Sequence, residues 1–153
     1  MHCYTTGETE SVARALAAYQ NPDGGFGHGL EADLRTERSS VLATTVALQT
    51  LSRIGAPAES PLVSGAMDYL RDTYDGSNWA LIDAGCNDAP HAPWWKWETR
   101  ANPPPGFRPN PGAEILSYLY TWPGTLPDPT RDDLCRRAVA HLENAVEMHD
   151  LLC

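Results

Sequence analysis

The spacing of apolar residues along the chain predicts five helices. In each of five segments, apolar side chains recur three and four residues apart, which is the period of one helix face. No segment alternates apolar and polar residues with turn signals at both ends, so no sheet is predicted. The expected helices are Ser11–Tyr19, Ser40–Ile54, Ser60–Tyr74, Ala113–Thr121 and Thr130–His149. The pattern therefore predicts an all-α protein.

The second of these helices is expected to be the most extensively buried on the evidence of its apolar positions. Its apolar positions cover most of the helix circumference, so the helix should be buried on nearly all sides. Ser39 and Ser40 are suitable N-caps before it, and Gly55 is placed to end it. Pro61 then stands at the first position of the next helix, where its missing N–H costs nothing.

Residues 76–112 lie between the third and fourth helices and lack helical spacing. This segment is rich in tryptophan and proline. Irregular segments longer than ~12–15 residues are usually functional or disordered. Disorder is disfavoured because it would leave several tryptophans in water. We therefore expect an ordered Trp/Pro-rich cap within a single domain that spans residues 1–153.

Composition and charge exclude some classes of partner. The 153 residues carry a formal net charge of −9, which opposes binding to the phosphates of nucleic acid. No apolar run approaches the ~20 residues that span a bilayer, so no membrane span is expected. The N-terminal residues lack the features of a secretory signal, which predicts a cytoplasmic protein with reduced cysteines. The C-terminal residues lack a helix terminator, which is typical of a fragment or a truncated chain.

A turn after the first predicted helix is repeated in outline after the third. The string YQNPDGGFG begins at Tyr19, and YDGSNW begins at Tyr74. Two helices between copies of one turn are typical of stacked helical hairpins. In each copy an Asp-Gly pair turns the chain, and the aromatic residue behind it, Phe26 or Trp79, can fill the gap between helices.

These motifs resemble a known superfamily. YQNPDGGFGHGLEAD (residues 19–33), followed by a helix containing LATTVAL, is similar to the repeat of terpenoid cyclases and of protein prenyltransferase beta subunits. Segments 88–95, 110–115 and 148–153 resemble blocks of uncharacterised bacterial proteins related to squalene cyclases. The resemblance implies helical hairpins of an α/α toroid, present here as an incomplete (α/α)6 barrel.

The chain departs from this superfamily in its catalytic motifs. A class II terpene cyclase is expected to carry a D-x-D-D general acid, which this sequence lacks. The prenyltransferase zinc site needs Asp-x-Cys, whereas the interval from Asp83 to Cys86 is one residue longer. We therefore predict neither a metal nor a cofactor.

Four residues are candidate acid–base groups. His28, Glu31 and Asp33 lie in the glycine-rich stretch before the buried helix, where a desolvated carboxylate can act as general acid or base. His91 lies three residues before two adjacent tryptophans, and imidazole can both accept and donate a proton. The alternative is that the carboxylates satisfy backbone N–H groups of an irregular loop and that the tryptophans form a small core of the cap.

Seven further residues are candidates for contact with a ligand. They are aromatic side chains expected around a cavity and two polar side chains of predicted helices: Phe26, Trp79, Trp94, Trp95, Trp97, Glu114 and His149. For Glu114 the alternative role is stabilisation of a helix N-terminus. For His149 it is a hydrogen-bonded position in the core.

Two functions remain as hypotheses. The first is an enzyme-like protein whose aromatic-lined cavity binds an apolar or cyclic small molecule and supports cyclase, isomerase or lyase chemistry. The second is a non-catalytic binding or scaffold module that retains the toroid fold. In either case an incomplete toroid exposes apolar helix faces, so we expect self-association into a homo-oligomer.

Overall fold

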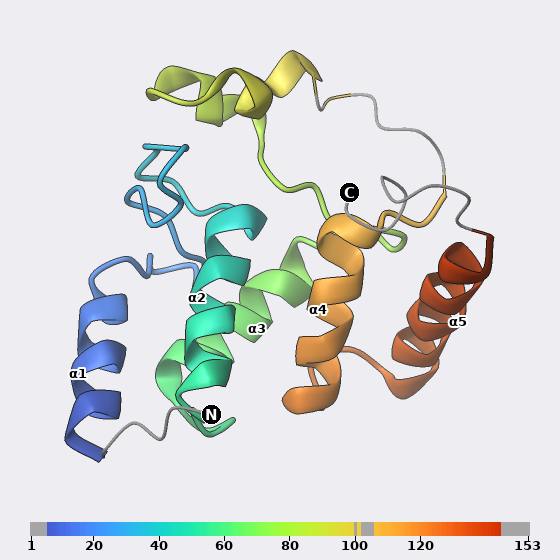
Figure 1. Ribbon diagram of the computed structural model, residues 1–153, viewed down its shortest axis with the longest axis horizontal. Helices are drawn as coiled ribbons and strands as arrows, with labels where there is room; N and C mark the ends of the chain where they lie inside the picture. The colour runs from blue at the N-terminus through green and yellow to red at the C-terminus, as the bar shows by residue number, and fades with distance from the viewer. Residues whose placement is uncertain (1–5, 100, 102–105, 145–153) are drawn as a thin grey trace.

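The computed structural model describes residues 6–99, 101 and 106–144, which form five α-helices and three short 3-10 helices (Figure 1). The α-helices are α1 (Thr6–Ala17), α2 (Val41–Arg53), α3 (Pro61–Asp72), α4 (Pro109–Thr121) and α5 (Asp128–Asn144). The 3-10 helices are η1 (Ala84–Asp88), η2 (Pro93–Trp95) and η3 (Trp97–Thr99). The described residues contain isolated β-bridges but no strand, so the all-α prediction is confirmed.

No helix in the described ranges combines the length and the apolar character that crossing a membrane requires.

Local signals explain where α2 and α3 begin. The Ser40 hydroxyl accepts a hydrogen bond from the backbone N of Ala43 at 3.0 Å, and this bond caps α2 as predicted. Gly55, with φ +68°, follows the end of α2. α3 begins at Pro61, also as predicted.

The other helices begin earlier than the apolar pattern predicts. α1 begins at Thr6 rather than Ser11, because its first turn is polar and adds nothing to the apolar period. α4 begins at Pro109 rather than Ala113, with a non-helical residue, Asn110, inside its first turn. α5 begins at Asp128 rather than Thr130, since a proline is well accommodated in a first helical turn.

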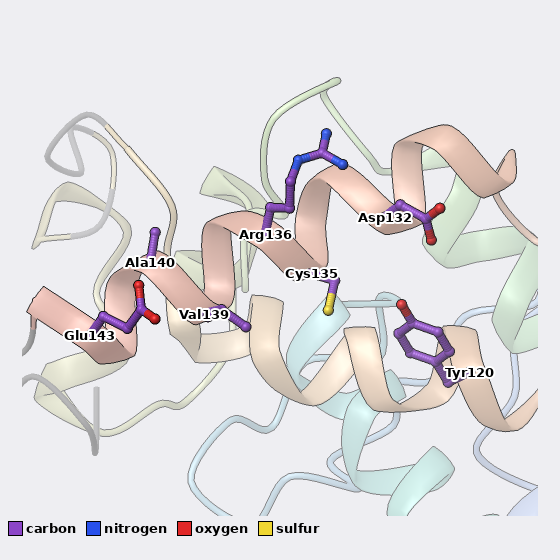
Figure 2. Close-up of a pocket in the computed structure, with 7 residues that line it drawn as sticks. All are labelled: Tyr120, Asp132, Cys135, Arg136, Val139, Ala140 and Glu143. Atoms are coloured by element: carbon purple, nitrogen blue, oxygen red, sulfur yellow. The ribbon is translucent and has the colours of Figure 1, made fainter.

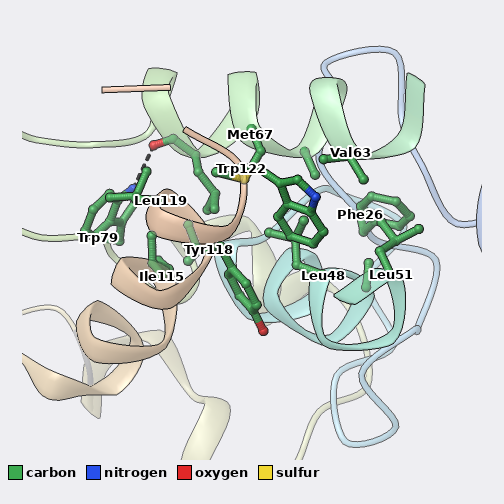
Figure 3. Close-up of a cluster of buried hydrophobic side chains, with 14 of the residues drawn as sticks. Phe26, Leu48, Leu51, Val63, Met67, Trp79, Ile115, Tyr118, Leu119 and Trp122 are labelled. Atoms are coloured by element: carbon green, nitrogen blue, oxygen red, sulfur yellow. Dashed lines mark hydrogen bonds between the residues drawn. The ribbon is translucent and has the colours of Figure 1, made fainter. Parts of the chain in front are cut away.

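The main core lies between α2, α3 and α4 (Figure 3). α2 packs on both α3 and α4, and α5 packs on α4. Buried side chains of this core include Leu48, Leu51, Val63, Met67, Ile115 and Leu119. Burial of an aliphatic side chain of this size contributes roughly 1.5–3 kcal/mol. α2 is therefore buried along most of its length, in agreement with its apolar pattern.

The cap, residues 76–112, has a second core of its own. Leu34, Leu81, Ile82 and Cys86 form this core, and Trp95 and Trp97 pack against it. η1, η2 and η3 all lie in the cap, so its described residues are folded, as expected.

The cap is attached to the residues before α2 through main-chain hydrogen bonds. Arg35 N donates to Pro90 O at 2.9 Å, and Ala92 N donates to Asp33 O at 2.8 Å. Leu42 N, in the first turn of α2, donates to Leu81 O at 3.0 Å. The cap and the loop before α2 therefore lie together at the N-terminal end of α2 (Figure 1).

Candidate functional site

The glycine-rich loop, residues 21–39, is held against α3 by Gln20. The Gln20 amide Nε2 donates to Gly24 O at 2.9 Å and to Leu62 O at 3.1 Å. Gly24 has φ +85° and lies so close to Gly65 of α3 that a Cβ at Gly24 would overlap with the Gly65 carbonyl group. This contact requires glycine, and it positions the polar side chains of the loop relative to α3.

Phe26 and Trp79 fill gaps in the main core, which is the packing role predicted for the aromatic residue of the repeated turn. Their exposed fractions are 0% and 1%. The Trp79 indole Nε1 also donates to Leu70 O, near the end of α3, at 2.7 Å (Figure 3). Because these side chains present no surface to a ligand, their predicted ligand contact is corrected to a structural role.

A surface cleft of about 660 Å³ lies between the glycine-rich loop, α3 and the cap. The loop supplies most of the lining, α3 supplies Tyr69, and the cap supplies Asp83. The lining residues are Asn21, Pro22, Asp23, His28, Glu37, Arg38, Ser39, Tyr69 and Asp83. This volume falls in the range of small-molecule sites. We call it the Tyr69 cleft.

A chain of hydrogen bonds connects four polar side chains of the cleft. The Asn21 Nδ2 donates to Glu37 O at 3.0 Å and to Ser39 Oγ at 2.9 Å. Ser39 Oγ donates in turn to Asp23 Oδ1 at 2.7 Å. Asn21 Oδ1 lies 2.9 Å from His28 Nε2.

This chain of hydrogen bonds selects the tautomer of His28. The Asn21 amide oxygen can only accept, because the amide nitrogen is the group that faces the Glu37 carbonyl. His28 Nε2 must therefore carry its proton and donate. In the neutral imidazole this leaves Nδ1 with a free lone pair, which can take up a proton from a bound molecule.

The backbone of His28 is held in a left-handed conformation. Its φ is +54°, and it is the one described non-glycine residue with a positive φ. A non-glycine residue pays roughly 1–2 kcal/mol for this conformation. Such strained residues are concentrated at functional sites, where the surrounding structure maintains them. His28 therefore combines a strained backbone, a selected tautomer and a position in the cleft wall.

The cleft lining also contains an ion pair and a partly buried phenol. Arg38 Nη2 lies 3.1 Å from Asp83 Oδ2, and both side chains are more than half exposed. A pair this exposed is worth about 0–1 kcal/mol, so it positions groups more than it stabilises the fold. Burial, together with the charges of Asp23 and Asp83, raises the pKa of Tyr69. Tyr69 therefore remains a neutral phenol that can donate and accept hydrogen bonds.

Of the four predicted acid–base residues, His28 alone lines the Tyr69 cleft. Glu31 Oε1 accepts a hydrogen bond from Asp33 N at 3.3 Å, which fits the alternative, for Glu31, that the carboxylate satisfies loop backbone. His91 lies in the backbone pairing between loop and cap, opposite Leu34, and its Nδ1 donates to Ala89 O at 2.7 Å. The prediction of one site containing all four residues is corrected accordingly.

The remaining predicted ligand contacts are dispersed. Trp95 and Trp97 belong to the core of the cap, whereas Trp94 is 54% exposed. Glu114 accepts a hydrogen bond from Gln49 Nε2 at 2.7 Å, which joins α2 to α4, and one from the Tyr118 hydroxyl within α4 at 2.6 Å. His149 lies outside the described residues.

Apart from His28, the lining residues were not predicted as site residues from the sequence: Asn21, Pro22, Asp23, Glu37, Arg38, Ser39, Tyr69 and Asp83. Within the part of the chain that the structure describes, no three His, Cys, Asp or Glu side chains are grouped so that they could hold a metal ion.

Comparison of the chain with protein-family models, curated proteins and solved structures finds no match to any of them.

Proposed function

We propose that the chain binds a small polar molecule in the Tyr69 cleft and that His28 is the acid–base group of this site. The observation that carries the proposal is the state of His28. Its backbone is strained, its Nε2 is committed to Asn21, and its Nδ1 is left to accept a proton. A histidine used only for packing needs none of these three properties.

The lining favours a polar ligand over the apolar ligand expected from the sequence. Two of the aromatic residues expected to line a cavity are buried in the core, and Tyr69 is the one Phe, Tyr or Trp residue in the cleft lining. Carboxylate oxygens of Asp23, Glu37 and Asp83 only accept hydrogen bonds. A molecule with several hydroxyl or amino donors therefore fits the lining best.

The proposed chemistry is proton transfer to or from the bound molecule, as in an isomerase or lyase. His28 would act through Nδ1, and the Tyr69 hydroxyl could donate a hydrogen bond to an oxygen that gains negative charge. A non-catalytic binding module is the second candidate. It is favoured by the separation of Glu31, Asp33 and His91 from the cleft.

The proposed architecture is part of an α/α toroid similar to that of squalene-cyclase-like proteins. In support, α2 is the most extensively buried helix and lies between α3 and α4, as an inner helix of a toroid would. The two repeated turns also serve one purpose, since each inserts its aromatic residue, Phe26 or Trp79, into the main core.

A ligand screen with one matched pair of variants tests the binding site. Asp23 Oδ1 accepts from Gly25 N, and Asp75 Oδ1 accepts from Ser77 N, so the two aspartates hold equivalent turns. Only Asp23 lines the cleft. Panels of polyols, sugars, amines and isoprenoid alcohols would be screened by amide chemical-shift perturbation, with affinities measured by titration.

We expect polar compounds to perturb the amides around the cleft. Asp23→Asn should weaken their binding at least about tenfold, the usual effect of losing a charged hydrogen-bond acceptor, while Asp75→Asn should leave it unchanged. Binding by isoprenoid alcohols alone, or equal loss in both variants, would contradict the proposal. Ligand turnover that stops in His28→Asn would distinguish an enzyme from a binding module.

A further inference from the structure

The exposed face of α5 carries a groove that the ligand cleft does not involve. It has a volume of about 380 Å³ and lies beside the end of α4, which contributes Tyr120 (Figure 2). The lining residues on α5 recur at helical spacing: Asp132, Cys135, Arg136, Val139, Ala140 and Glu143. They therefore form one continuous stripe along the helix.

Large apolar side chains are exposed along this stripe and beside it. Tyr120 is 51% exposed and Val139 is 47% exposed, and the adjacent Leu142 is 59% exposed. On the other side of α5, Leu134 is fully buried in the main core. α5 is thus apolar on two sides, and only one of them is covered by the described fold. Contiguous exposed apolar surface of this kind marks interaction sites.

The charged residues on the stripe are arranged so that they complement those of a second copy of α5. Arg136 and Glu143 lie seven residues apart, two turns, with Val139 and Ala140 between them. A second α5 packed antiparallel, with a two-fold axis between Val139 and Ala140, would place Arg136 of each copy beside Glu143 of the other. The apolar residues would then meet at the centre. A surface that is complementary to itself in this way suits an isologous dimer.

Arg136 and Glu143 can pair with a second copy because neither is held in a strong ion pair within the described chain. Glu143 has no ion pair among the described residues, and Arg136 pairs only with Asp133 of its own helix, at 2.9 Å. Both side chains of that pair are more than half exposed, so the bond is weak and can be exchanged at little cost.

We propose that the groove beside α5 binds α5 of a second copy of this chain, antiparallel, with reciprocal Arg136–Glu143 ion pairs around Val139. Because the contact involves only α5 and Tyr120 of each copy, we expect a weak dimer that forms at micromolar to millimolar concentration. This association is independent of ligand binding in the Tyr69 cleft.

Charge-reversal variants test the proposed pairing. Arg136→Glu places glutamate against glutamate in the dimer, and Glu143→Arg places arginine against arginine. Sedimentation equilibrium should show the association constant lowered at least about tenfold in each single variant. In an equimolar mixture, the dimer of one variant with the other has two ion pairs, one with the original polarity and one with reversed polarity, so the mixture should associate about as well as the original chain.

Two controls separate the pairing from misfolding and from another interface. Circular dichroism of each variant establishes that α5 remains folded. If either charge variant unfolds, Val139→Glu provides the same test by placing a charge at the centre of the contact. A chain that stays monomeric at millimolar concentration, a mixture no stronger than its components, or dimers unaffected by Val139→Glu would each overturn the proposal.

Discussion

Gly24 of the glycine-rich loop and Gly65 of α3 touch through their backbones. A Cβ at Gly65 would come within 3.3 Å of Gly24 Cα, and a Cβ at Gly24 would overlap with the Gly65 carbonyl group. Side chains larger than hydrogen would therefore force the loop away from α3. The shape of the Tyr69 cleft depends on this contact, because Asn21 and Asp23 lie on one side of it and Tyr69 on the other.

Gly24→Ala should destabilise the protein much more than Gly76→Ala. Both glycines have positive φ, +85° and +91°, but a Cβ at Gly76 meets nothing within 4 Å. We expect Gly76→Ala to lower the free energy of unfolding by about 1 kcal/mol, from backbone strain alone. Gly24→Ala should cost about 1–3 kcal/mol more, from the added steric overlap. Urea denaturation measures both, and equal losses would show that the contact with Gly65 is unimportant.

Replacing His28 by glycine should give a more stable protein than replacing it by alanine. Both variants lose the hydrogen bond to Asn21, but glycine also removes the cost of the left-handed backbone. We expect the unfolding free energy of His28→Gly to exceed that of His28→Ala by about 1–2 kcal/mol. Both should lose ligand binding equally. A reversed order of stability would mean that the backbone at this position is not strained.

Trp79→Phe should destabilise the main core. The change removes the indole N–H that donates to Leu70 O and leaves unfilled volume around a fully buried ring. We expect a loss of about 2–4 kcal/mol in the free energy of unfolding. Trp94→Phe serves as the comparison, since Trp94 is 54% exposed, and should cost less than about 1 kcal/mol. Thermal and urea unfolding measure both losses. Similar losses in Trp79→Phe and Trp94→Phe would show that Trp79 does not have the packing role assigned to it.

Tyr118 should make the protein less stable at alkaline pH. Burial, the hydrogen bond to Glu114 and the charge of that carboxylate raise the pKa of Tyr118 above its unfolded value of about 10. Its stabilising contribution is therefore complete below about pH 10 and is lost as the pH rises further, because the unfolded chain ionises first. The loss reaches at most about 1.4 kcal/mol per pH unit.

The pH dependence can be assigned to this residue by substitution. Above about pH 10 the unfolding free energy of the original chain should fall with pH. Tyr118→Phe should make the slope of this fall smaller, by the amount that corresponds to at most one proton released on unfolding. Tyr19→Phe is the matched control, because Tyr19 takes no part in the contact with Glu114. An unchanged slope in Tyr118→Phe would show that this phenol ionises equally in the folded and unfolded chain.

Local sequence signals predicted the helices better than they predicted the site. The Ser40 cap, the Pro61 start and the burial of α2 follow from residues within a few positions of one another. His28 was identified because its glycine neighbours mark an irregular backbone. In contrast, Tyr69 lies within the helical stripe of α3, where its spacing is that of any core residue.

The remaining cleft residues have no local signature. Asp83 is 45 residues from Arg38, its ion-pair partner, and Ser39 is 18 residues from Asn21. The first pair comes together only when the loop and the cap have packed, and the second only when the two ends of the glycine-rich loop meet. The aromatic residues were misassigned for a related reason: a tryptophan that fills a core and one that lines a cavity have the same local sequence pattern.

The attachment of the cap has a consequence for how this protein can change through evolution. The bonds from Arg35 N to Pro90 O and from Ala92 N to Asp33 O join main-chain atoms. Main-chain bonds do not depend on which side chains the two segments carry. Exposed residues of the cap and of the glycine-rich loop can therefore diverge while the attachment persists, and the specificity of the cleft can be altered without loss of its framework.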